Sequence, residues 1–582
     1  MRKKAFFQAF LLVVVGCLFF SCSNTPDNEV EYFAFQETKD GDWGLISSDG
    51  EVLFAGEFDN APTVVRDGCF FVQNDKGKWE LFEADKKPKK IGSEYLSVSA
   101  FRNGHAFVVE KDKPVTIINT KGEMVKELHK IEGKTVVGVC APNMKGNAIF
   151  QTADTLYGVI DVSGDCVIKP EYIDLNHFGL DRYIAVSKKY KGKDSKKYSI
   201  LSKNGEVLLE LSSDRYEEIG TPSLDGKLIP VAVEKDNEKA WGLLNDKGEE
   251  VLKPTTRIEK ISAVFGDKFI FKKDRKWGLM NVEGEKMIYA KYDELMYDET
   301  KKVLIAGKED NGMSWKYINE EDEQLSSETF TRALDFSILD GKHTIVKPDD
   351  HIYALINSEY EMLKGQPDMV DISLSEGCNW IGSDYIDFNE FIAKLQLKQN
   401  SIFGLSLQSK PVDVANLNSQ WDEYFEPDPR LHGYLNKLAM RRSLDYTHLE
   451  LEVLFDDIIG REVEDEGMPI EDEDLEVADG PCEWTDAKPQ KIELNIEKTS
   501  KLNGKMDTLF GMIADIYKKG AAIVKQNNNA LLLKCKDGSV CAVVRDFNSI
   551  TISIISATYA ADFLEGFSID KYDGPILEGD FD

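Results

Sequence analysis

Short apolar runs alternate with polar turns through most of the first 365 residues. One such stretch begins at Trp241 with Trp-Gly-Leu-Leu, continues through the polar residues 245–248 and reaches a second apolar run, Val251-Leu252. Two apolar runs joined by a turn that ends in glycine predict a β-hairpin, because glycine adopts the positive φ that such turns need. Pro254 ends the second run, since it has no N–H for a ladder. We therefore expect a mainly β structure.

This hairpin recurs nine times. Its lead position stands every 36 to 43 residues, at Trp43, Trp79, Val115, Tyr157, Tyr198, Trp241, Trp277, Trp315 and Tyr353. Seven residues later a glycine recurs at Gly50, Gly122, Gly164, Gly205, Gly248 and Gly284. Another glycine directly follows the lead aromatic at Gly44, Gly158, Gly242 and Gly278. Glycine at this second place predicts a close approach of neighbouring backbone.

A period of this length predicts that neighbouring units stack into one continuous core, because a single unit cannot bury its own apolar face. A closed β-propeller is favoured, since it leaves no free sheet edges, and an open β-solenoid is the alternative. Propellers usually have four to eight blades. Nine copies therefore imply either a copy shared across the closure or the open solenoid. In the closed form we expect residues 32–35 to supply an N-terminal strand that completes the last blade.

The recurring aromatics have two interpretations. They could be platforms on which carbohydrate rings stack, or they could pack between hairpins as core. Recurrence in every unit favours the core, because a binding site rarely uses all repeats equally. Binding is then expected at the loops, which vary in length, on one face of the scaffold.

These residues resemble the WG-repeat family, whose motif is a Trp-Gly strand, an Asp/Asn-x-x-Gly turn and a second strand. The resemblance covers roughly residues 31–365. It is best at Trp43, Trp241 and Trp277, and weaker at Val115 and Trp315, which glycine does not follow. It implies a β-repeat scaffold and transfers no catalytic residue.

The N-terminus has the pattern of an export signal. Three basic residues, 2–4, precede an almost wholly apolar stretch, 5–20, that is short for a membrane span. Residues 18–22, Leu-Phe-Phe-Ser-Cys, resemble a bacterial lipobox, which implies lipid attachment at Cys22. We therefore expect a signal peptide over 1–21 and a tether over 22–30. Ser23 after the cysteine favours delivery to the outer membrane, with the face left open. The alternatives are an ordinary cleaved signal and a short uncleaved anchor.

Beyond the repeat region, 31–372, the pattern changes to an α+β composition. We expect an α+β segment over 373–455, an acidic linker over 456–489 and a second α+β segment over 490–582. The periodicity predicts helices over 387–396, 434–443 and 504–519, and strands over 446–455, 521–525, 530–535, 540–544 and 550–556. Asp537-Gly538 predicts a hairpin turn. The linker lacks the ligand spacing of a Ca²⁺ loop, so a solvated, disordered segment is favoured.

The net charge and the cysteine count limit the kinds of partner and site that the chain can have. The formal net charge is −32, and it becomes −35 once the three basic residues of 1–21 are removed. This balance argues against nucleic acid as a partner. Seven cysteines remain after Cys17 and Cys22, an odd number without CxxC spacing, which is typical of neither a disulfide framework nor a zinc site. We expect no bond between Cys535 and Cys541.

The sequence contains no GxSxG, P-loop or dinucleotide-binding motif, and its seven histidines form no HExxH motif. We therefore predict no catalytic residue, no metal and no cofactor.

Three hypotheses for function follow. The favoured one is a non-enzymatic, lipid-anchored protein of the cell envelope whose repeat scaffold binds a protein or a glycan. The second is an envelope hydrolase with its site in 373–582, which would need a pocket joining His432 or His448 to an acid. The third is a structural spacer.

Overall fold

The computed structural model describes residues 30–179, 182–188, 196–235, 237–310, 312–417, 423–425, 436–444, 447–457, 460–462, 482–499 and 502–572. The expected signal peptide and Cys22 lie outside these residues. The chain divides into two units, residues 1–385 and 386–582. Within the described residues, no helix is both long enough and apolar enough to cross a bilayer.

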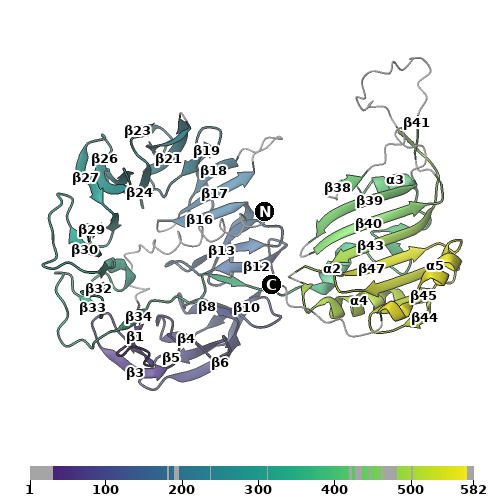
Figure 1. The fold of residues 1–582 in the computed structure, drawn as a ribbon, viewed down its shortest axis with the longest axis horizontal. Helices are drawn as coiled ribbons and strands as arrows, with labels where there is room; N and C mark the ends of the chain where they lie inside the picture. Colours follow the sequence, from purple (N-terminus) through teal and green to yellow (C-terminus); the bar gives the residue numbers. More distant parts are fainter. Residues whose placement is uncertain are drawn as a thin grey trace, which may run out of the picture. The chain divides into compact units, whose positions relative to one another are not determined.

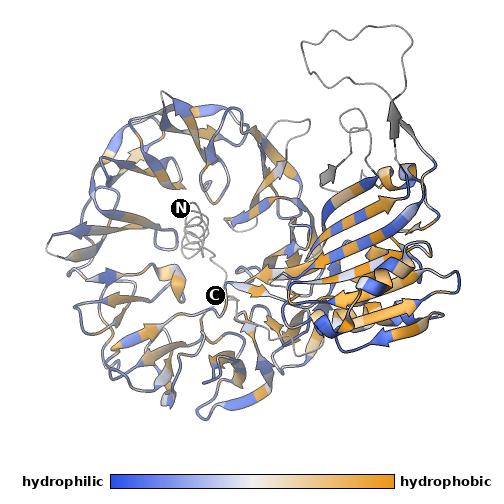
Figure 2. Ribbon diagram, turned by 45° about the vertical axis from the view of Figure 1, so that its right-hand side comes forward, coloured by the Kyte–Doolittle hydropathy of each residue, from blue (hydrophilic) through white to orange (hydrophobic). Residues whose placement is uncertain are grey.

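The first unit is a nine-bladed β-propeller. Its described residues form nine antiparallel sheets that follow one another around a ring (Figure 1). Figure 2 shows hydrophobic residues gathered on the strands and hydrophilic residues at the turns around this ring.

The blades are numbered in chain order. Blades 1 to 3 comprise β1 (Phe33–Gln36), β2 (Trp43–Ile46) and β3 (Val52–Phe58); β4 (Cys69–Gln73), β5 (Trp79–Glu83) and β6 (Lys89–Tyr95); and β7 (Ser97–Val98), β8 (His105–Val109), β9 (Val115–Asn119) and β10 (Met124–Leu128). Blades 4 and 5 comprise β11 (Lys130–Ile131), β12 (Lys134–Cys140), β13 (Asn147–Thr152), β14 (Tyr157–Asp161) and β15 (Cys166–Tyr172); and β16 (Asp174–Phe178), β17 (Arg182–Lys188), β18 (Lys196–Leu201) and β19 (Val207–Ser212).

The remaining four blades continue in the same order. Blades 6 and 7 comprise β20 (Glu218–Ile219), β21 (Leu228–Lys235), β22 (Glu238–Asn245) and β23 (Glu250–Thr255); and β24 (Lys260–Phe265), β25 (Lys268–Lys273), β26 (Lys276–Asn281) and β27 (Lys286–Tyr292). Blades 8 and 9 comprise β28 (Glu294–Asp298), β29 (Val303–Glu309) and β30 (Met313–Ile318); and β31 (Arg332–Ala333), the 3-10 helix η2 (Phe336–Ile338), β32 (Thr344–Lys347) and β33 (Ala354–Ile356).

Each of the nine lead positions falls in a different blade. The propeller is therefore confirmed, while the expectation that a closed ring would share one copy is wrong. The open solenoid is excluded, because blade 1 packs against blade 9. A Cβ placed on Gly50 of blade 1 would lie 4.0 Å from side-chain carbons of Leu355 and Leu363 in blade 9. Gly205 meets Ile168 of the preceding blade in the same way, and Gly248 meets Leu209.

In four blades, the glycine after the lead aromatic allows a bulged hairpin. Trp241 pairs with Thr255, and the register shifts before the next pair, Leu243 with Leu252. At this shift the carbonyl oxygen of Leu252 lies 2.5 Å from where a Cβ on Gly242 would stand. Gly44, Gly158 and Gly278 meet a carbonyl oxygen at the same 2.5 Å. The close backbone approach that the sequence predicts is thus confirmed, and it explains why glycine recurs there.

The C-terminal end of the first unit returns to blades 1 and 4. β34 (Asp371–Ser373) pairs with β1 in blade 1, and β35 (Trp380–Gly382) pairs with β12 in blade 4. Figure 1 shows β34 beside β1. The expectation that an N-terminal strand completes the last blade is therefore wrong, because β1 forms a hairpin with β2 in its own blade. Residues 371–385, called the strap from here on, belong to the first unit, although the sequence pattern placed 373–385 in the C-terminal region.

The second unit is built on one antiparallel sheet. Its eight strands run in the order β38 (Glu423–Phe425), β39 (Lys437–Leu444), β40 (Thr447–Phe455), β43 (Pro489–Glu497), β47 (Ser549–Ile555), β46 (Val540–Arg545), β45 (Ala530–Lys534) and β44 (Ala522–Gln526). Two short pairs accompany it, β36 (Ser401–Ile402) with β37 (Leu405–Ser406) and β41 (Gly460–Glu462) with β42 (Cys482–Trp484). The helices are α2 (Phe388–Leu395), α3 (Pro411–Ala415), α4 (Met506–Lys518), α5 (Ala560–Gly566) and the 3-10 helix η5 (Ile569–Tyr572).

The two faces of this sheet carry different cores. Leu451, Leu494 and Ile552 pack in one cluster with α2 and α4. Their neighbours along the strands point to the opposite face, as the period of two requires. There Leu532 and Val540 form a smaller cluster with α5.

Two sequence expectations for this unit fail. Residues 434–443 were expected to be a helix, but β39 occupies Lys437–Leu444. Leu438 and Met440 point into the core two residues apart, and pairing with β40 overrides the helical propensity of the Leu, Lys, Met and Arg residues there. The acidic stretch does not join two separate parts, because β40 and β43 on either side of it are paired neighbours. Most of it, 463–481, lies outside the described residues.

Candidate binding sites on the propeller

The recurring lead residues lie between the blades. Each of the nine packs in or against a different one of nine apolar clusters. Trp241 is 2% exposed and Trp277 is 8% exposed. Trp43, Trp79, Tyr157 and Trp315 are partly buried against their clusters. These positions hold neighbouring blades together, so sites for ligands have to be sought elsewhere on the scaffold.

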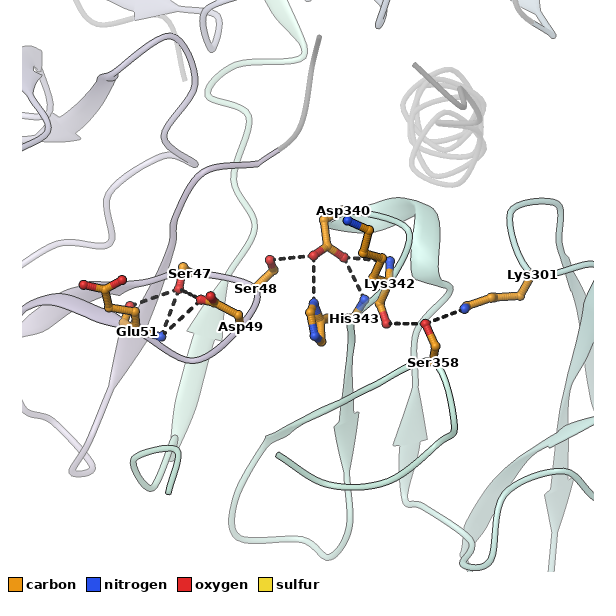
Figure 3. Close-up of polar contacts among 9 residues, drawn as sticks. All are labelled: Ser47, Ser48, Asp49, Glu51, Lys301, Asp340, Lys342, His343 and Ser358. Atoms are coloured by element: carbon orange, nitrogen blue, oxygen red, sulfur yellow. Dashed lines mark hydrogen bonds and ion pairs between the residues drawn. The ribbon is translucent and has the colours of Figure 1, made fainter. Parts of the chain in front are cut away.

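A Ser, Asp and His group stands at the seam between blades 9 and 1 (Figure 3). Asp340 accepts hydrogen bonds from the Ser48 hydroxyl at 2.8 Å and lies 2.7 Å from Nδ1 of His343. A nucleophilic relay needs the serine hydroxyl bonded to the histidine. Here both side chains meet the carboxylate instead, so this arrangement joins two blades and does not activate Ser48.

A second set of contacts joins blade 9 to blade 8. Lys301 Nζ donates to Ser358 Oγ at 2.7 Å, and this hydroxyl donates to the carbonyl of Lys342 at 3.1 Å (Figure 3). Burial would raise the pKa of Asp340. Hydrogen bonds from His343, from two backbone amides and from Ser48 outweigh burial and hold this pKa below its usual range. The charged carboxylate is therefore the form that the seam stabilises.

Two further acids lie beside this seam, inside blades 8 and 9. Asp298 is 1% exposed and accepts backbone N–H groups of Thr300, Lys301 and Phe336 at 2.8–2.9 Å. Burial, together with the nearby charge of Asp298, raises the pKa of Asp335 to about 6. A perturbed carboxyl can mark an active site. The three donors to Asp298, however, are all backbone N–H groups. This pattern is typical of a buried carboxylate that links turns, and we assign Asp298 a structural role rather than a catalytic one.

A socket for a carboxylate stands at blades 2 and 3. Arg66 precedes β4 and Arg102 precedes β8, and their side chains are 6% and 5% exposed. Their Nη2 atoms lie 2.8 Å and 2.7 Å from the two carboxylate oxygens of Glu376 in the strap. Burial would raise the pKa of Glu376, but the two guanidinium groups outweigh it and lower this pKa to about 2. Glu376 is therefore ionised throughout the physiological range.

A cavity of roughly 250 Å³ opens between blades 1 and 2. Its acidic lining residues are Glu57, Asp59, Asp75 and Glu80, and the others are Phe58, Asn60, Val72, Gln73, Asn74 and Phe82. Phe58 and Phe82 meet edge to face with ring centroids 5.0 Å apart. Glu80 is already engaged by Asn74 and Lys90. The cavity thus combines an aromatic wall with carboxylates, and its lining contains no basic residue.

The histidines do not gather into a site in the described part of the chain. His129 stands edge to face with Tyr385, and His448 lies 3.0 Å from the Ser443 hydroxyl. His432 lies outside the described residues. Among those residues, no group of three His, Cys, Asp or Glu side chains could hold a metal ion. Cys69, Cys140, Cys166, Cys378, Cys535 and Cys541 are free thiols.

Sequence reasoning missed the arginine socket, although part of its signal was present. Arg66-Asp-Gly and Arg102-Asn-Gly stand one repeat period apart, at equivalent places in two blades. Glu376 could not have been chosen from the many acidic residues of this chain, because only the return of the strap brings it to these blades.

Comparisons with known proteins agree with the repeat. The family model described as WG containing repeat matches residues 43–79 and 241–277, each running from one lead tryptophan to the next. No curated protein gives a significant match.

Two solved structures are similar in outline. One, described as a crystal structure of the eukaryotic initiation factor, is 10% identical, with 59% of this chain and 97% of that chain covered and a TM-score of 0.40. The other, the WD40 β-propeller domain of Doa1, is 12% identical, with 44% and 90% covered and a TM-score of 0.23. TM-scores this low do not establish a shared fold. The propeller is therefore assigned from the strand pairing of this chain alone.

Proposed function

Starting from the WG repeats that this chain carries, we propose that it is a non-enzymatic binding scaffold of the bacterial cell envelope. A lipid on Cys22 anchors it, in the outer membrane, and the propeller binds a protein or a glycan. The cavity between blades 1 and 2 is the observation that carries this proposal. It offers polar and aromatic groups on a rigid ring whose recurring aromatics are committed to the core.

The chemistry of the cavity favours a protein partner. Glu57, Asp59 and Asp75 line it without a basic neighbour among the lining residues. A lysine or arginine side chain of a partner would meet these carboxylates with its charge and the Phe58 and Phe82 wall with its methylene stem. A volume of roughly 250 Å³ accommodates one such side chain.

The cavity is tested by affinity capture from detergent-solubilised envelope with the mature full-length chain. The test variant combines Glu57→Gln, Asp59→Asn and Asp75→Asn. The matched control makes the same number of neutral replacements on turns of other blades, Asp246→Asn, Glu249→Gln and Glu283→Gln, so both lose equal charge. We expect the control to capture as much partner as the natural chain. The cavity variant should capture at least tenfold less. Equal capture by both variants would show that the cavity is not the binding site.

The anchor is tested separately by metabolic labelling with radioactive palmitate. We expect the natural chain to incorporate label and to fractionate with the outer membrane, and Cys22→Ser to do neither. Label that persists in Cys22→Ser would place the lipid elsewhere. An unlabelled natural chain would favour an ordinary cleaved signal and leave the cavity experiment unaffected.

A further inference from the structure

The strap runs along blades 1 to 4 as an added strand. It pairs with β1 through β34 and with β12 through β35. Between these pairings Val64 N–H donates to the Ser375 carbonyl at 2.8 Å, and Ala100 N–H donates to the Glu376 carbonyl at 2.7 Å. Cys378 N–H donates to the Val98 carbonyl at 2.7 Å. These are the bonds by which an extended peptide adds to a sheet edge.

Three residues of the strap fix its position on the blades. Glu376 fills the socket of Arg66 and Arg102. Gly377 follows with φ +84, and a Cβ there would lie 2.5 Å from the Val98 carbonyl oxygen, so the place admits glycine alone without strain. Four residues after Glu376, the indole of Trp380 lies against Gly138 of β12, where a Cβ would come within 2.3 Å of it. A segment that fits along these blades therefore needs a carboxylate, a glycine directly after it and a large aromatic residue four positions after the carboxylate.

The strap is held by polar contacts along its length and by a few apolar side chains. Residues 372–378 are half-buried and residues 379, 380 and 382 are exposed, while Ile381 is fully buried. Ile372 and Leu374 pack against one apolar cluster of the ring and Ile381 lies in another, while the backbone hydrogen bonds and the two arginines hold the segment between them. Contacts of this kind are available to any extended segment with the same three features.

We propose that the edge of blades 2 to 4 along which the strap runs is a strand-binding site with a carboxylate socket, which the strap occupies as an intramolecular ligand. Its external ligand is an extended segment of a partner protein that carries an acidic residue, glycine next to it and an aromatic residue four positions after the acid. The strap excludes this segment by its high effective concentration, so binding requires displacement of the strap. This site is separate from the cavity between blades 1 and 2, and its test does not depend on the function proposed above.

The test uses the full mature chain and a fluorescent synthetic peptide with the sequence of residues 370–384. A second peptide carries glutamine in place of the glutamate at 376. The chain variant is Glu376→Gln, which weakens the internal ligand and keeps its shape. The control is Glu250→Gln, which removes the partner of the exposed Arg215 instead.

We expect Glu376→Gln to bind the glutamate peptide at least tenfold more tightly than the glutamine peptide by fluorescence anisotropy. The natural chain and Glu250→Gln should bind neither peptide measurably. Equal affinity of Glu376→Gln for both peptides, or no binding of either to a folded variant, would overturn the proposal.

Hydrogen exchange on the unaltered chain covers the case in which the variant does not fold. The amides of Cys378 and Ser383 donate to blade carbonyls, as do the amides of the blades themselves. We expect these two strap amides to exchange at least tenfold faster than the amides of β4 and β8, because the strap leaves while the ring stays closed. Strap amides that exchange only together with those of the blades would show a permanent strand and refute an exchangeable ligand.

Discussion

Replacing Trp241 with alanine tests whether the recurring aromatics hold the blades together. Trp241 is 2% exposed and packs with Leu243, Phe271 and Met280. A tryptophan buries about 200 Å² of surface. At about 25 cal/mol per Å² this corresponds to about 5 kcal/mol of transfer free energy. Measured Trp→Ala and Phe→Ala losses of about 3–5 kcal/mol include partial collapse of the site. We therefore expect Trp241→Ala to lower the free energy of unfolding by about 4 kcal/mol.

This loss is measured by urea unfolding of the full chain, monitored by circular dichroism. Calorimetry measures it independently. The two units can unfold in separate transitions, so the shift must appear in the propeller transition alone. Tyr289→Ala in the next blade is the control. Tyr289 is 71% exposed, so its removal should change the stability by less than about 0.5 kcal/mol. A loss below about 1 kcal/mol for Trp241→Ala, together with loss of glycan binding, would refute the core role and favour stacking platforms.

Three further outcomes are expected. Gly242→Ala should destabilise the propeller transition by about 1–3 kcal/mol in urea unfolding, because its Cβ would lie 2.5 Å from the Leu252 carbonyl oxygen; an unchanged midpoint would contradict the bulge geometry. Gly511→Ala, in the middle of α4 with open space around it, should stabilise the second unit by about 0.5–1 kcal/mol, and a destabilisation would mean that the space is filled. Asp335 has a folded pKa of about 6 and an ordinary unfolded pKa near 4, so the folded chain binds its proton more tightly and the contribution of Asp335 to stability falls as pH rises through this window. Asp335→Asn should remove this contribution, so that the stability of the variant relative to the natural chain rises by about 3 kcal/mol between about pH 4 and pH 6; a relative stability that does not change with pH in thermal melts would locate the titration elsewhere.

The repeat allowed unusually detailed prediction in the first unit. The turn glycines, the glycines after the lead aromatics and the spacing of the hairpins all follow from local backbone rules, and the described residues obey them. In the second unit local rules predicted α2 and α4 but failed at β39. A run such as Lys437–Leu444 satisfies helical propensity as well as a strand pattern, and its pairing with β40 decided between them.

The candidate sites depended far more on the tertiary fold. Glu57 and Asp75 line one cavity because adjacent blades meet there, and acidic residues are too common in this chain for that pair to be chosen in advance. Ser48 meets Asp340 across 292 positions of the chain because blade 9 returns to blade 1. No periodicity encodes such a contact.

By itself, the sequence determined that the chain contains nine hairpins with apolar partners on both sides, since the period of apolar residues and the turn glycines act locally. The tertiary structure decided that these hairpins close into a ring of nine and that the strap lies along blades 1 to 4. It also decided that Arg66, Arg102 and Glu376 form one socket. The physical reason is that ring closure depends on the small angle added by each blade and on contacts between residues hundreds of positions apart, which no local pattern records.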